Sequence, residues 1–230
     1  MTTTRTEHVG DMAAHVVVPD GGSGPGIVLL MEIFGVGPYI KKAAERLASI
    51  GYTVLAPDLY WRIAPGATPA HTPEGLQEAF GLVQQLDVPA AVGDAIGALA
   101  HLRSMPETRG RAGVLGFCLG GTLAYLVAAN GDPDVAVAYY GSGIHDALSQ
   151  GDAITCPLLL HYGGRDDYIP MDRISLVRDA FADRDEIELH VHDAGHAFDN
   201  SEAPMFYDAS ASDAAWKLTA EFLSRTFPVA

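Results

Sequence analysis

Short runs of apolar residues alternate along the chain with longer segments in which apolar residues recur at every third or fourth position. The short runs predict buried strands, and the periodic segments predict amphipathic helices. Their regular alternation is typical of crossover units, so the pattern predicts an α/β fold with a mostly parallel sheet that helices cover on both faces. The predicted strands span residues 14–18, 26–32, 53–56, 112–116, 135–140, 157–162 and 186–191.

The helical segments have recognisable ends as well as a period. Residues 39–50 carry apolar side chains at helical spacing and stop at Gly51, a residue that suits the end of a helix. Residues 211–226 are expected to pack on the sheet through one apolar face. That face consists of Ala211, Ala215, Leu218 and Phe222. Residues 60–72 are rich in proline and glycine and predict a structured loop over the sheet. The other predicted helices span residues 73–85, 89–104, 119–129 and 171–181.

Composition fits one compact unit. The chain has 230 residues, 48% of them hydrophobic, and shows neither an internal repeat nor a linker, so we expect a single domain over residues 1–230. Its two cysteines, Cys118 and Cys156, do not indicate a disulfide framework. Cys156 opens an apolar run and is expected to be a small core residue.

Charge narrows the range of partners. Fourteen lysines and arginines stand against 29 acidic residues, which gives a net charge of −15. Such a surface repels phosphate backbones and anionic lipids, so no nucleic-acid or membrane partner is expected. The amino-terminal segment has no apolar leader, and no apolar stretch approaches the roughly 18 residues of a membrane span, which predicts a soluble cytoplasmic protein. Both a monomer and a small homo-oligomer remain open.

Residues 116–121 read G-F-C-L-G-G between an apolar run and a helical segment. A strand that turns abruptly into a helix strains the residue at the corner, and its neighbours must be small, a condition that Gly116 and Gly120 meet around Cys118. The helix that follows directs free N–H groups toward the sulfur and favours its thiolate. The motif therefore predicts a reactive cysteine.

A cysteine that attacks a carbonyl needs a base, and the base needs an acidic residue to orient it. Two later loops offer these groups at the ends of predicted strands. One carries Asp166 and Asp167, and the other carries His196. The order nucleophile, acid, histidine is that of α/β-hydrolases, and the carboxyl ends of parallel strands share one edge of the sheet. The other histidines, His71 included, are expected to be structural or on the surface.

Glu32 follows directly on an apolar run. A buried carboxylate there needs a polar partner, and an ion pair with Arg62 is one interpretation. The backbone N–H of Ile33 and that of Leu119, the residue after the predicted nucleophile, are the expected donors of an oxyanion hole.

Several short blocks, in order along nearly the whole chain, resemble those of the dienelactone hydrolase (carboxymethylenebutenolidase) family of the α/β-hydrolase superfamily. The blocks are M-E-I-F-G-V at 31–36, P-D-L-Y at 57–60, A-P-G at 64–66, V-G-D at 92–94, G-F-C-L-G-G at 116–121, Y-Y-G at 139–141, G-G-R-D-D-Y-I-P at 163–170 and A-G-H-A-F at 194–198.

The resemblance implies an α/β-hydrolase fold with Cys118 as nucleophile, His196 as base and Asp166 as the orienting acid. It selects Asp166 because the family's acid stands four residues before the proline of its block. Asp167 is then expected to face solvent or to cap the following helix. The resemblance also implies that Glu32 contacts the thiol and helps to control its ionisation.

Two positions depart from the family's pattern. Family members that act on dienelactone, an anion, hold its carboxylate with two arginines, and here the corresponding positions fall near Leu76 and at Asn200. Losing two charge-assisted pairs favours a neutral or less acidic substrate. The residues expected to bind the substrate, in addition to Glu32, are Phe34, Tyr60, Arg62, Leu76, Phe80, Tyr140 and Phe198.

The sequence thus predicts a cysteine hydrolase that cleaves a lactone or an activated ester through an acyl-enzyme. No metal-binding spacing is present and no cofactor is expected. A general carboxylesterase or thioesterase is the alternative among enzymes. A non-catalytic binding protein or a redox-sensing thiol protein is the alternative from another class.

Overall fold

The computed structural model describes residues 2–229 and contains one eight-stranded sheet in the order β1-β2-β4-β3-β5-β6-β7-β8. The pairs β1–β2 and β2–β4 are antiparallel, and the remaining pairs are parallel. The strands are β1 (Thr3–Val9), β2 (Met12–Val18), β3 (Gly26–Leu30), β4 (Thr53–Pro57), β5 (Ala112–Phe117), β6 (Ala136–Tyr139), β7 (Leu158–Gly163) and β8 (Ile187–His192).

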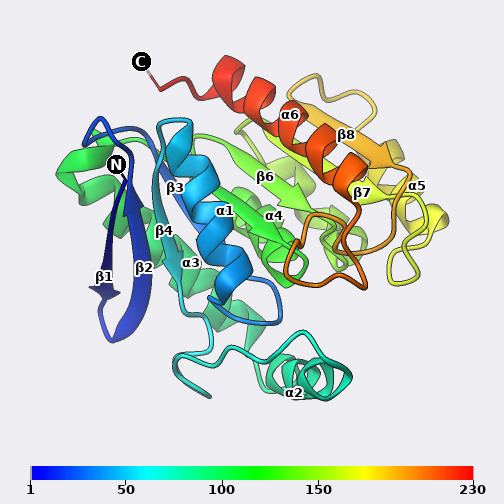
Figure 1. Ribbon diagram of the computed structural model, residues 1–230. Helices are drawn as coiled ribbons and strands as arrows, with labels where there is room; N and C mark the ends of the chain where they lie inside the picture. Colours follow the sequence, from blue (N-terminus) through cyan, green and yellow to red (C-terminus); the bar gives the residue numbers. More distant parts are fainter. Residues whose placement is uncertain (1, 230) are drawn as a thin grey trace.

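Helices cover both faces of this sheet (Figure 1). On one face α1 packs against β4 and α6 packs against β7 and β8, whereas α3 and α4 pack together against β3 and β5 on the other. The helices are α1 (Pro38–Ser49), α2 (Pro73–Val83), α3 (Val88–Ser104), α4 (Leu119–Asn130), α5 (Met171–Ala180) and α6 (Ala209–Thr226), with 3-10 turns at Pro106–Thr108, Ile144–Asp146 and Leu148–Ala153.

The predicted α/β fold is confirmed, and each predicted strand and helix is present with its ends shifted by a few residues at most. Sequence analysis missed β1, which pairs only with β2 and is exposed or half-buried along its length. An edge strand of this kind has no apolar run to reveal it. Gly10, with φ +60°, lies in the turn between β1 and β2 and was the available signal of a hairpin.

The chain reverses its direction of travel across the sheet at β3. From β3 it moves to β4 on one side, and it then returns to place β5 on the other side of β3. Ligands of open α/β sheets bind at such a switch point, outside the carboxyl ends of the strands. Leu30 is paired with Gly116, so Glu32 and Cys118 leave these two strands at the same level.

The turn from β5 into α4 has the strained geometry that the motif predicts. Cys118 has φ +54° and ψ −112°, a conformation that costs free energy in any residue other than glycine. A Cβ atom on Gly116 would lie 1.9 Å from the carbonyl oxygen of Gly120, and one on Gly120 would lie 2.2 Å from that of Leu30. Only glycine therefore allows the helix to start this close to β3.

The packing of α6 differs in detail from the predicted apolar face. Leu218 is only half-buried, and Thr219 is fully buried instead. The Thr219 hydroxyl lies 2.6 Å from the Tyr139 hydroxyl and 3.0 Å from Nε2 of His161, while Nδ1 of His161 lies 3.0 Å from Nε2 of His192. Burial holds the pKa of His161 well below its usual value, so this buried chain of hydrogen bonds joins neutral groups.

Helix α2 extends beyond the carboxyl edge of the sheet (Figure 1). Thr72 caps it by accepting a hydrogen bond from the N–H of Gly75 at 3.1 Å. Only Gly75 and Ala79 of this helix are buried. The loop that leads to it is fixed to α3, because Asp94 accepts a hydrogen bond from Nε1 of Trp61 at 2.9 Å. The long loop between β4 and α2 is thereby anchored to α3 near its start.

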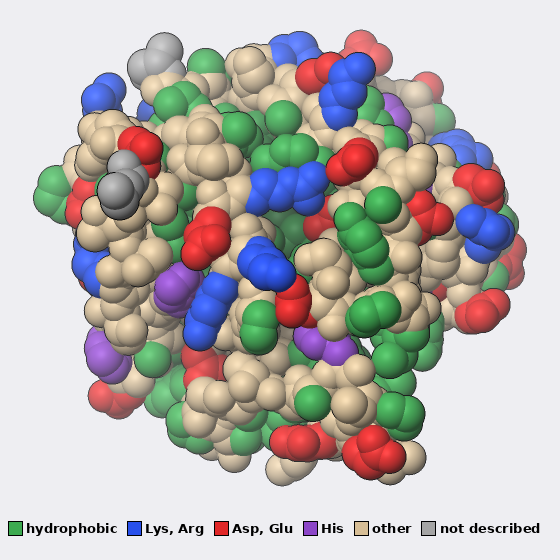
Figure 2. All heavy atoms as spheres, viewed as in Figure 1, with side chains coloured by type: hydrophobic (Ala, Val, Ile, Leu, Met, Phe, Trp, Pro, Cys, Tyr) green, Lys and Arg blue, Asp and Glu red, His purple; other side chains and the backbone are tan. Residues whose placement is uncertain are grey.

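The face that carries α1 and α6 shows acidic and basic side chains interspersed (Figure 2). Within residues 2–229, no helix combines the length and the apolar character that a membrane crossing requires.

We expect Gly120→Ala to lower the free energy of unfolding by about 2 kcal/mol or more, because its methyl group would overlap the backbone of Leu30. Gly97→Ala in α3 is the matched control, since a Cβ there meets nothing within 4 Å. It should raise the free energy of unfolding by up to about 1 kcal/mol. Urea unfolding followed by circular dichroism measures both. Equal stability of the two variants would contradict the close packing inferred at Gly120.

Candidate active site

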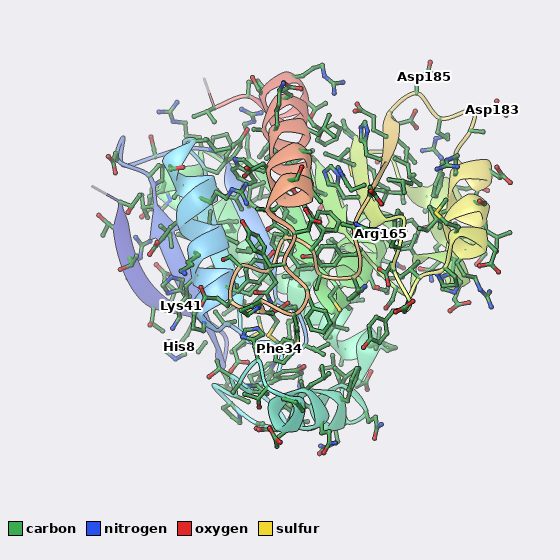
Figure 3. All side chains as sticks on the ribbon, turned by 45° about the vertical axis from the view of Figure 1, so that its right-hand side comes forward. His8, Phe34, Lys41, Arg165, Asp183 and Asp185 are labelled. Atoms are coloured by element: carbon green, nitrogen blue, oxygen red, sulfur yellow. The ribbon has the colours of Figure 1, made fainter. Side chains whose placement is uncertain are left out.

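A cavity of about 380 Å³ opens between the carboxyl ends of β3 and β5 and the inner side of α2. Figure 3 shows Phe34, one of its walls, at the end of the sheet that faces α2. Most of the lining is apolar. The lining residues are Glu32, Ile33, Phe34, Leu76, Phe80, Val83, Val88, Cys118, Leu119, Thr122, Leu123, Ser142, Gly143, Tyr168, His196, Ala197 and Phe206.

Cys118, His196 and Asp166 form a continuous chain of contacts at the wall of this cavity. Sγ of Cys118 lies 3.2 Å from Nε2 of His196, and Nδ1 of His196 lies 2.7 Å from Oδ2 of Asp166. The other carboxylate oxygen of Asp166 accepts hydrogen bonds from the N–H groups of Tyr168 at 2.8 Å and Ile169 at 3.0 Å. Asp167 is exposed, so Asp166 is the aspartate that reaches the histidine.

The surroundings of His196 favour its charged form. Burial acts to lower the pKa of this imidazole, but the charges and hydrogen bonds of Cys118 and Asp166 outweigh it and raise the pKa to about 10. The rings of Tyr140 and Tyr168 lie 5.2 Å and 5.0 Å from the imidazole ring. The arrangement therefore stabilises the imidazolium form of His196.

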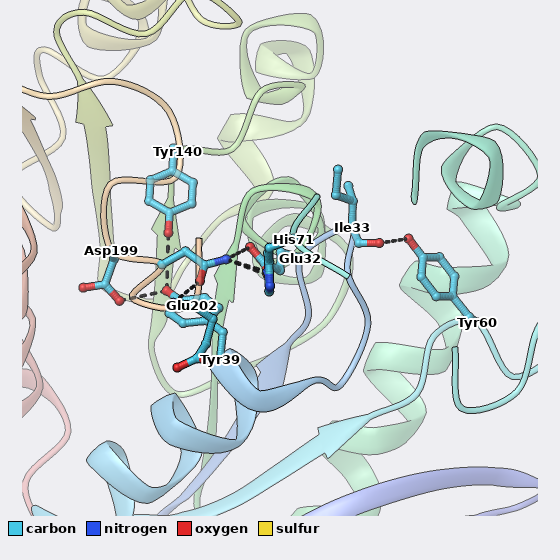
Figure 4. A network of polar contacts seen from close by, with 9 residues as sticks. Glu32, Ile33, Tyr39, Tyr60, His71, Tyr140, Asp199 and Glu202 are labelled. Carbon is cyan, nitrogen blue, oxygen red and sulfur yellow. Dashed lines mark hydrogen bonds and ion pairs between the residues drawn. The ribbon is translucent and has the colours of Figure 1, made fainter. Parts of the chain in front are cut away.

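Tyr140 is held beside His196 by a buried polar network (Figure 4). Its hydroxyl lies 3.4 Å from that of Tyr39, which donates a hydrogen bond to Oδ2 of Asp199 at 2.8 Å. Asp199 also accepts hydrogen bonds from Ser212 at 2.6 Å and Arg46 at 3.2 Å. Burial raises the pKa of Tyr140 and of Tyr39 well above the usual value, so both hydroxyls stay protonated. Tyr140 has φ +39°, and this network supports that strained backbone.

Glu32 is buried, and its carboxylate faces two partners that were not predicted. Nδ2 of Asn200 donates to both carboxylate oxygens, at 2.9 Å and 3.0 Å, and Nε2 of His71 lies 3.3 Å from Oε1. No hydrogen bond joins Glu32 to Sγ of Cys118 among residues 2–229. Arg62 is not its partner either, because Arg62 pairs with Asp94 on the surface.

The two residues whose backbone N–H groups are the predicted oxyanion donors both border the cavity. Ile33 and Leu119 both line the cavity, and Leu119 is the first residue of α4. Neither N–H donates to another group within the described part of the chain. The Tyr60 hydroxyl donates to the carbonyl oxygen of Ile33 at 2.8 Å and so orients the Ile33–Phe34 peptide, which follows the one that carries the Ile33 N–H.

Of the residues predicted to bind the substrate, Phe34, Leu76 and Phe80 line the cavity. Tyr60 lies behind Ile33, and Arg62 lies on the surface. Tyr140 and Phe198 are fully buried and pack on each other with ring centroids 5.2 Å apart. None of these four residues lines the cavity, so their predicted contact with the substrate is not seen; Tyr60, Tyr140 and Phe198 support the site from behind, whereas Arg62 pairs with Asp94 instead.

Sequence reasoning missed most of the far wall and the role of His71. His71 was grouped with the structural or surface histidines and given no place in the site, yet it contacts Glu32 and its ring centroid lies 4.2 Å from that of Phe34. A histidine in the loop that approaches the catalytic edge was the available signal. The missed lining residues are Val83, Val88, Thr122, Leu123, Ser142, Gly143, Tyr168, Ala197 and Phe206.

The charge of the cavity wall follows from this lining. Within the described part of the chain, none of the side chains around the cavity is lysine or arginine, and Glu32 is the acidic one. Residues 2–229 also contain no group of three or more His, Cys, Asp or Glu side chains placed to hold a metal ion. The groups at hand are a thiol, an imidazole, two carboxylates and free backbone N–H groups, which suit nucleophilic attack on a carbonyl.

Comparison with known proteins agrees with this chemistry. A family model described as the dienelactone hydrolase family matches residues 12–227. The chain is 36% identical over 216 residues to carboxymethylenebutenolidase 1 of Cupriavidus pinatubonensis, covering 94% of this chain and 92% of that protein. It is 35% identical to a carboxymethylenebutenolidase of a Pseudomonas species, covering 96% of this chain and 92% of that one.

A solved structure extends the likeness to three dimensions. The dienelactone hydrolase-like promiscuous phosphotriesterase P91, from metagenomic libraries, superposes with a TM-score of 0.76 at 25% identity, covering 98% of each chain. Sequence, fold and the geometry of the strand ends thus agree, and the chain belongs to the dienelactone hydrolase family and is a hydrolase that acts on ester bonds.

Proposed function

We propose that Cys118, His196 and Asp166 form the catalytic triad of a hydrolase that cleaves an uncharged lactone or activated ester. The observation that carries this proposal is the unbroken chain from Sγ through the imidazole to a buried carboxylate, at the wall of an apolar cavity. A protein that only binds its ligand has no need of such a chain. A redox-sensing thiol would not need two free N–H groups beside it.

Acylation begins with the thiolate of Cys118. Its electron pair forms a bond to the carbonyl carbon, and the carbonyl π electrons move to the oxygen, which the N–H groups of Ile33 and Leu119 stabilise. As the tetrahedral intermediate collapses, the bond to the leaving oxygen breaks and Nε2 of His196 gives that oxygen its proton. The products are a thioester on Cys118 and an alcohol, or the ring-opened end of a lactone.

Deacylation reverses the role of the histidine. The now neutral His196 takes a proton from water at Nε2, and the resulting hydroxide attacks the thioester carbon in the same oxyanion hole. The C–S bond then breaks, and its electrons return to Cys118 as a thiolate. Asp166 holds the tautomer and stabilises the imidazolium at both stages.

The chemistry and the cavity together narrow the substrate class. A thiolate leaves a tetrahedral intermediate more readily than an alkoxide does, so productive turnover needs a good leaving group such as an enolate or a phenolate. The cavity offers an apolar lining, a buried Glu32 and no lysine or arginine within the described residues, which disfavours a carboxylate-bearing substrate. The curated relatives are named for a lactone, and a general carboxylesterase or thioesterase would use the same residues.

We expect Cys118→Ala to lower kcat/KM for 4-nitrophenyl hexanoate by at least about a thousandfold, since Sγ of Cys118 is the nucleophile that contacts Nε2 of His196. Cys156→Ala is the matched control and should retain wild-type activity, because Cys156 is a buried core residue. Steady-state hydrolysis followed by nitrophenolate release measures both. Hydrolysis by Cys118→Ala at the parent's rate would refute the proposal.

Asp166→Asn should lower kcat/KM for the same ester by roughly a hundredfold or more, because the amide favours the wrong tautomer of His196. Asp167→Asn changes the neighbouring, exposed carboxylate and should leave kcat/KM within about twofold of the parent. If the two variants lose activity equally, the assignment of Asp166 as the orienting acid fails.

The proposed ion pair between Cys118 and His196 predicts how the pKa of His196 changes when its negative partner is removed. The pKa of His196, raised to about 10 in the parent, should fall in Cys118→Ser, which keeps a hydrogen-bonding group but removes the negative charge that supports the imidazolium. Burial, which lowers the pKa of His196, is then no longer opposed by the charge of Cys118. NMR of ¹⁵N-labelled histidine follows the titration, with Cys156→Ser as the control. An unchanged His196 titration in Cys118→Ser would contradict a thiolate–imidazolium pair.

Leu76 falls near a position where the resembled family carries an arginine, so placing an arginine there predicts a gain of function. Leu76→Arg places a cation at the cavity wall, so it should raise kcat/KM for the 4-nitrophenyl monoester of adipate on the order of tenfold relative to the hexanoate ester. These two esters differ only in a carboxylate in place of a methyl group. Leu76→Met should leave their ratio unchanged. No change of the ratio in Leu76→Arg would show that charge at this wall does not select the substrate.

A further inference from the structure

Glu32 and Phe34 separate two cavities. On one side lies the cavity that contains Cys118, and on the other lies a cavity of about 430 Å³ that reaches His71 and Glu202. The His71 side chain is 14% exposed and faces Glu32 from this second side. Figure 4 shows His71 and Glu32 next to each other. His71 can therefore affect the catalytic cavity through Glu32 without lining it.

The hydrogen bonds around His71 are compatible with two protonation states. The amide of Asn200 has a fixed orientation, because its Oδ1 accepts a hydrogen bond from the N–H of Glu202 at 2.9 Å, which leaves Nδ2 facing Glu32. Nε2 of His71 lies 3.1 Å from this Nδ2 and 3.3 Å from Oε1 of Glu32. Nε2 can accept one N–H of Asn200, which leaves the other N–H to be shared by the two Glu32 oxygens, or it can donate a hydrogen bond to Glu32, but it cannot do both at once.

The two states give the wall of the catalytic cavity different charges. When His71 is neutral and accepts from Asn200, the Glu32 carboxylate is held only by uncharged donors and keeps its full negative charge. When His71 is protonated and donates to Oε1, the pair is neutral overall. A substrate carboxylate on the far side of Glu32 is repelled in the first state and tolerated in the second.

We propose that His71 is a positioning residue that sets substrate specificity by pH, excluding carboxylate-bearing esters when it is neutral and admitting them when it is protonated. This rests on the proposed esterase function of the same site. Histidine is the side chain suited to such a change, because its ordinary titration falls between pH 5 and 8. An arginine at the same carboxylate would stay charged throughout.

The other charged groups that face His71 do not supply this change. Glu202, on the loop after β8, forms an ion pair with Lys42 of α1. Tyr39 of α1 lines the same second cavity, and burial raises its pKa well above the usual value. Across Glu32, His196 has a pKa of about 10 and stays protonated beside Cys118.

The test compares kcat/KM for the adipate monoester with kcat/KM for the hexanoate ester from pH 5.5 to 8.5. Taking the ratio cancels any effect of pH on the chemical step, because the same catalytic groups act on both esters. In the parent the ratio should rise on the order of tenfold toward pH 5.5. In His71→Gln, which keeps a hydrogen-bond donor without a charge, it should be flat. The control His101→Gln removes a histidine that pairs with Glu7 instead and should behave as the parent.

A second readout does not depend on turnover. The dissociation constants of two uncleaved amides, hexanamide and adipamate, measured by NMR on the parent and on His71→Gln, should show the same pH dependence of their ratio. A flat ratio in the parent, or an equal slope in His71→Gln, overturns the role of His71. Failure of the esterase proposal is distinguishable, because Cys118→Ala would then hydrolyse the hexanoate ester as fast as the parent while the binding ratio still reports on His71.

Discussion

The close approach of α4 to the end of β3 is the constraint on which the rest of the site depends. It exists because Gly120 has no side chain, which lets the helix begin against the backbone of Leu30. The chain can then turn sharply after β5, and Cys118 takes up a left-handed backbone at the corner. Parallel pairing of β3 with β5 brings Ile33 and Leu119 to the same level, so one packing contact places both the sulfur and the two free N–H groups.

A strained corner holds its geometry only when the groups around it are fixed, and two buried polar networks do this. Asp199 gathers Tyr39, Ser212 and Arg46, and through Tyr39 it supports Tyr140 beside the imidazole of His196. Further along the sheet, hydrogen bonds join Tyr139 to Thr219, Thr219 to His161, and His161 to His192. Buried polar groups that have all their partners rigidify a structure, whereas any missing partner would be costly.

Most of the fold and the centre of the site could be predicted from the sequence because both follow from local rules. Apolar periodicity gives the buried strands and helices, and the glycines around Cys118 reveal the turn. The edge strand β1 carries no such pattern. The far wall of the cavity, from Val83 to Phe206, could not be predicted because most of its residues are ordinary apolar or small ones brought together only by tertiary packing. The partners of Glu32 were missed for a related reason. A buried carboxylate needs a polar partner, and an ion pair with Arg62 would meet that need as well as the observed contacts with Asn200 and His71 do.

In the proposed mechanism, reaction and specificity are separable because they depend on different contacts. The thiol, imidazole and carboxylate face one another through short direct hydrogen bonds, so a change at any of them affects every substrate. Glu32 is different, because it borders the cavity without a hydrogen bond to Cys118, and its charge acts on a substrate at a distance. An uncharged amide at position 200 can hold this carboxylate in place but cannot neutralise it. Neutralisation then falls to His71, the remaining side chain within reach among the described residues, and a histidine supplies it only while protonated.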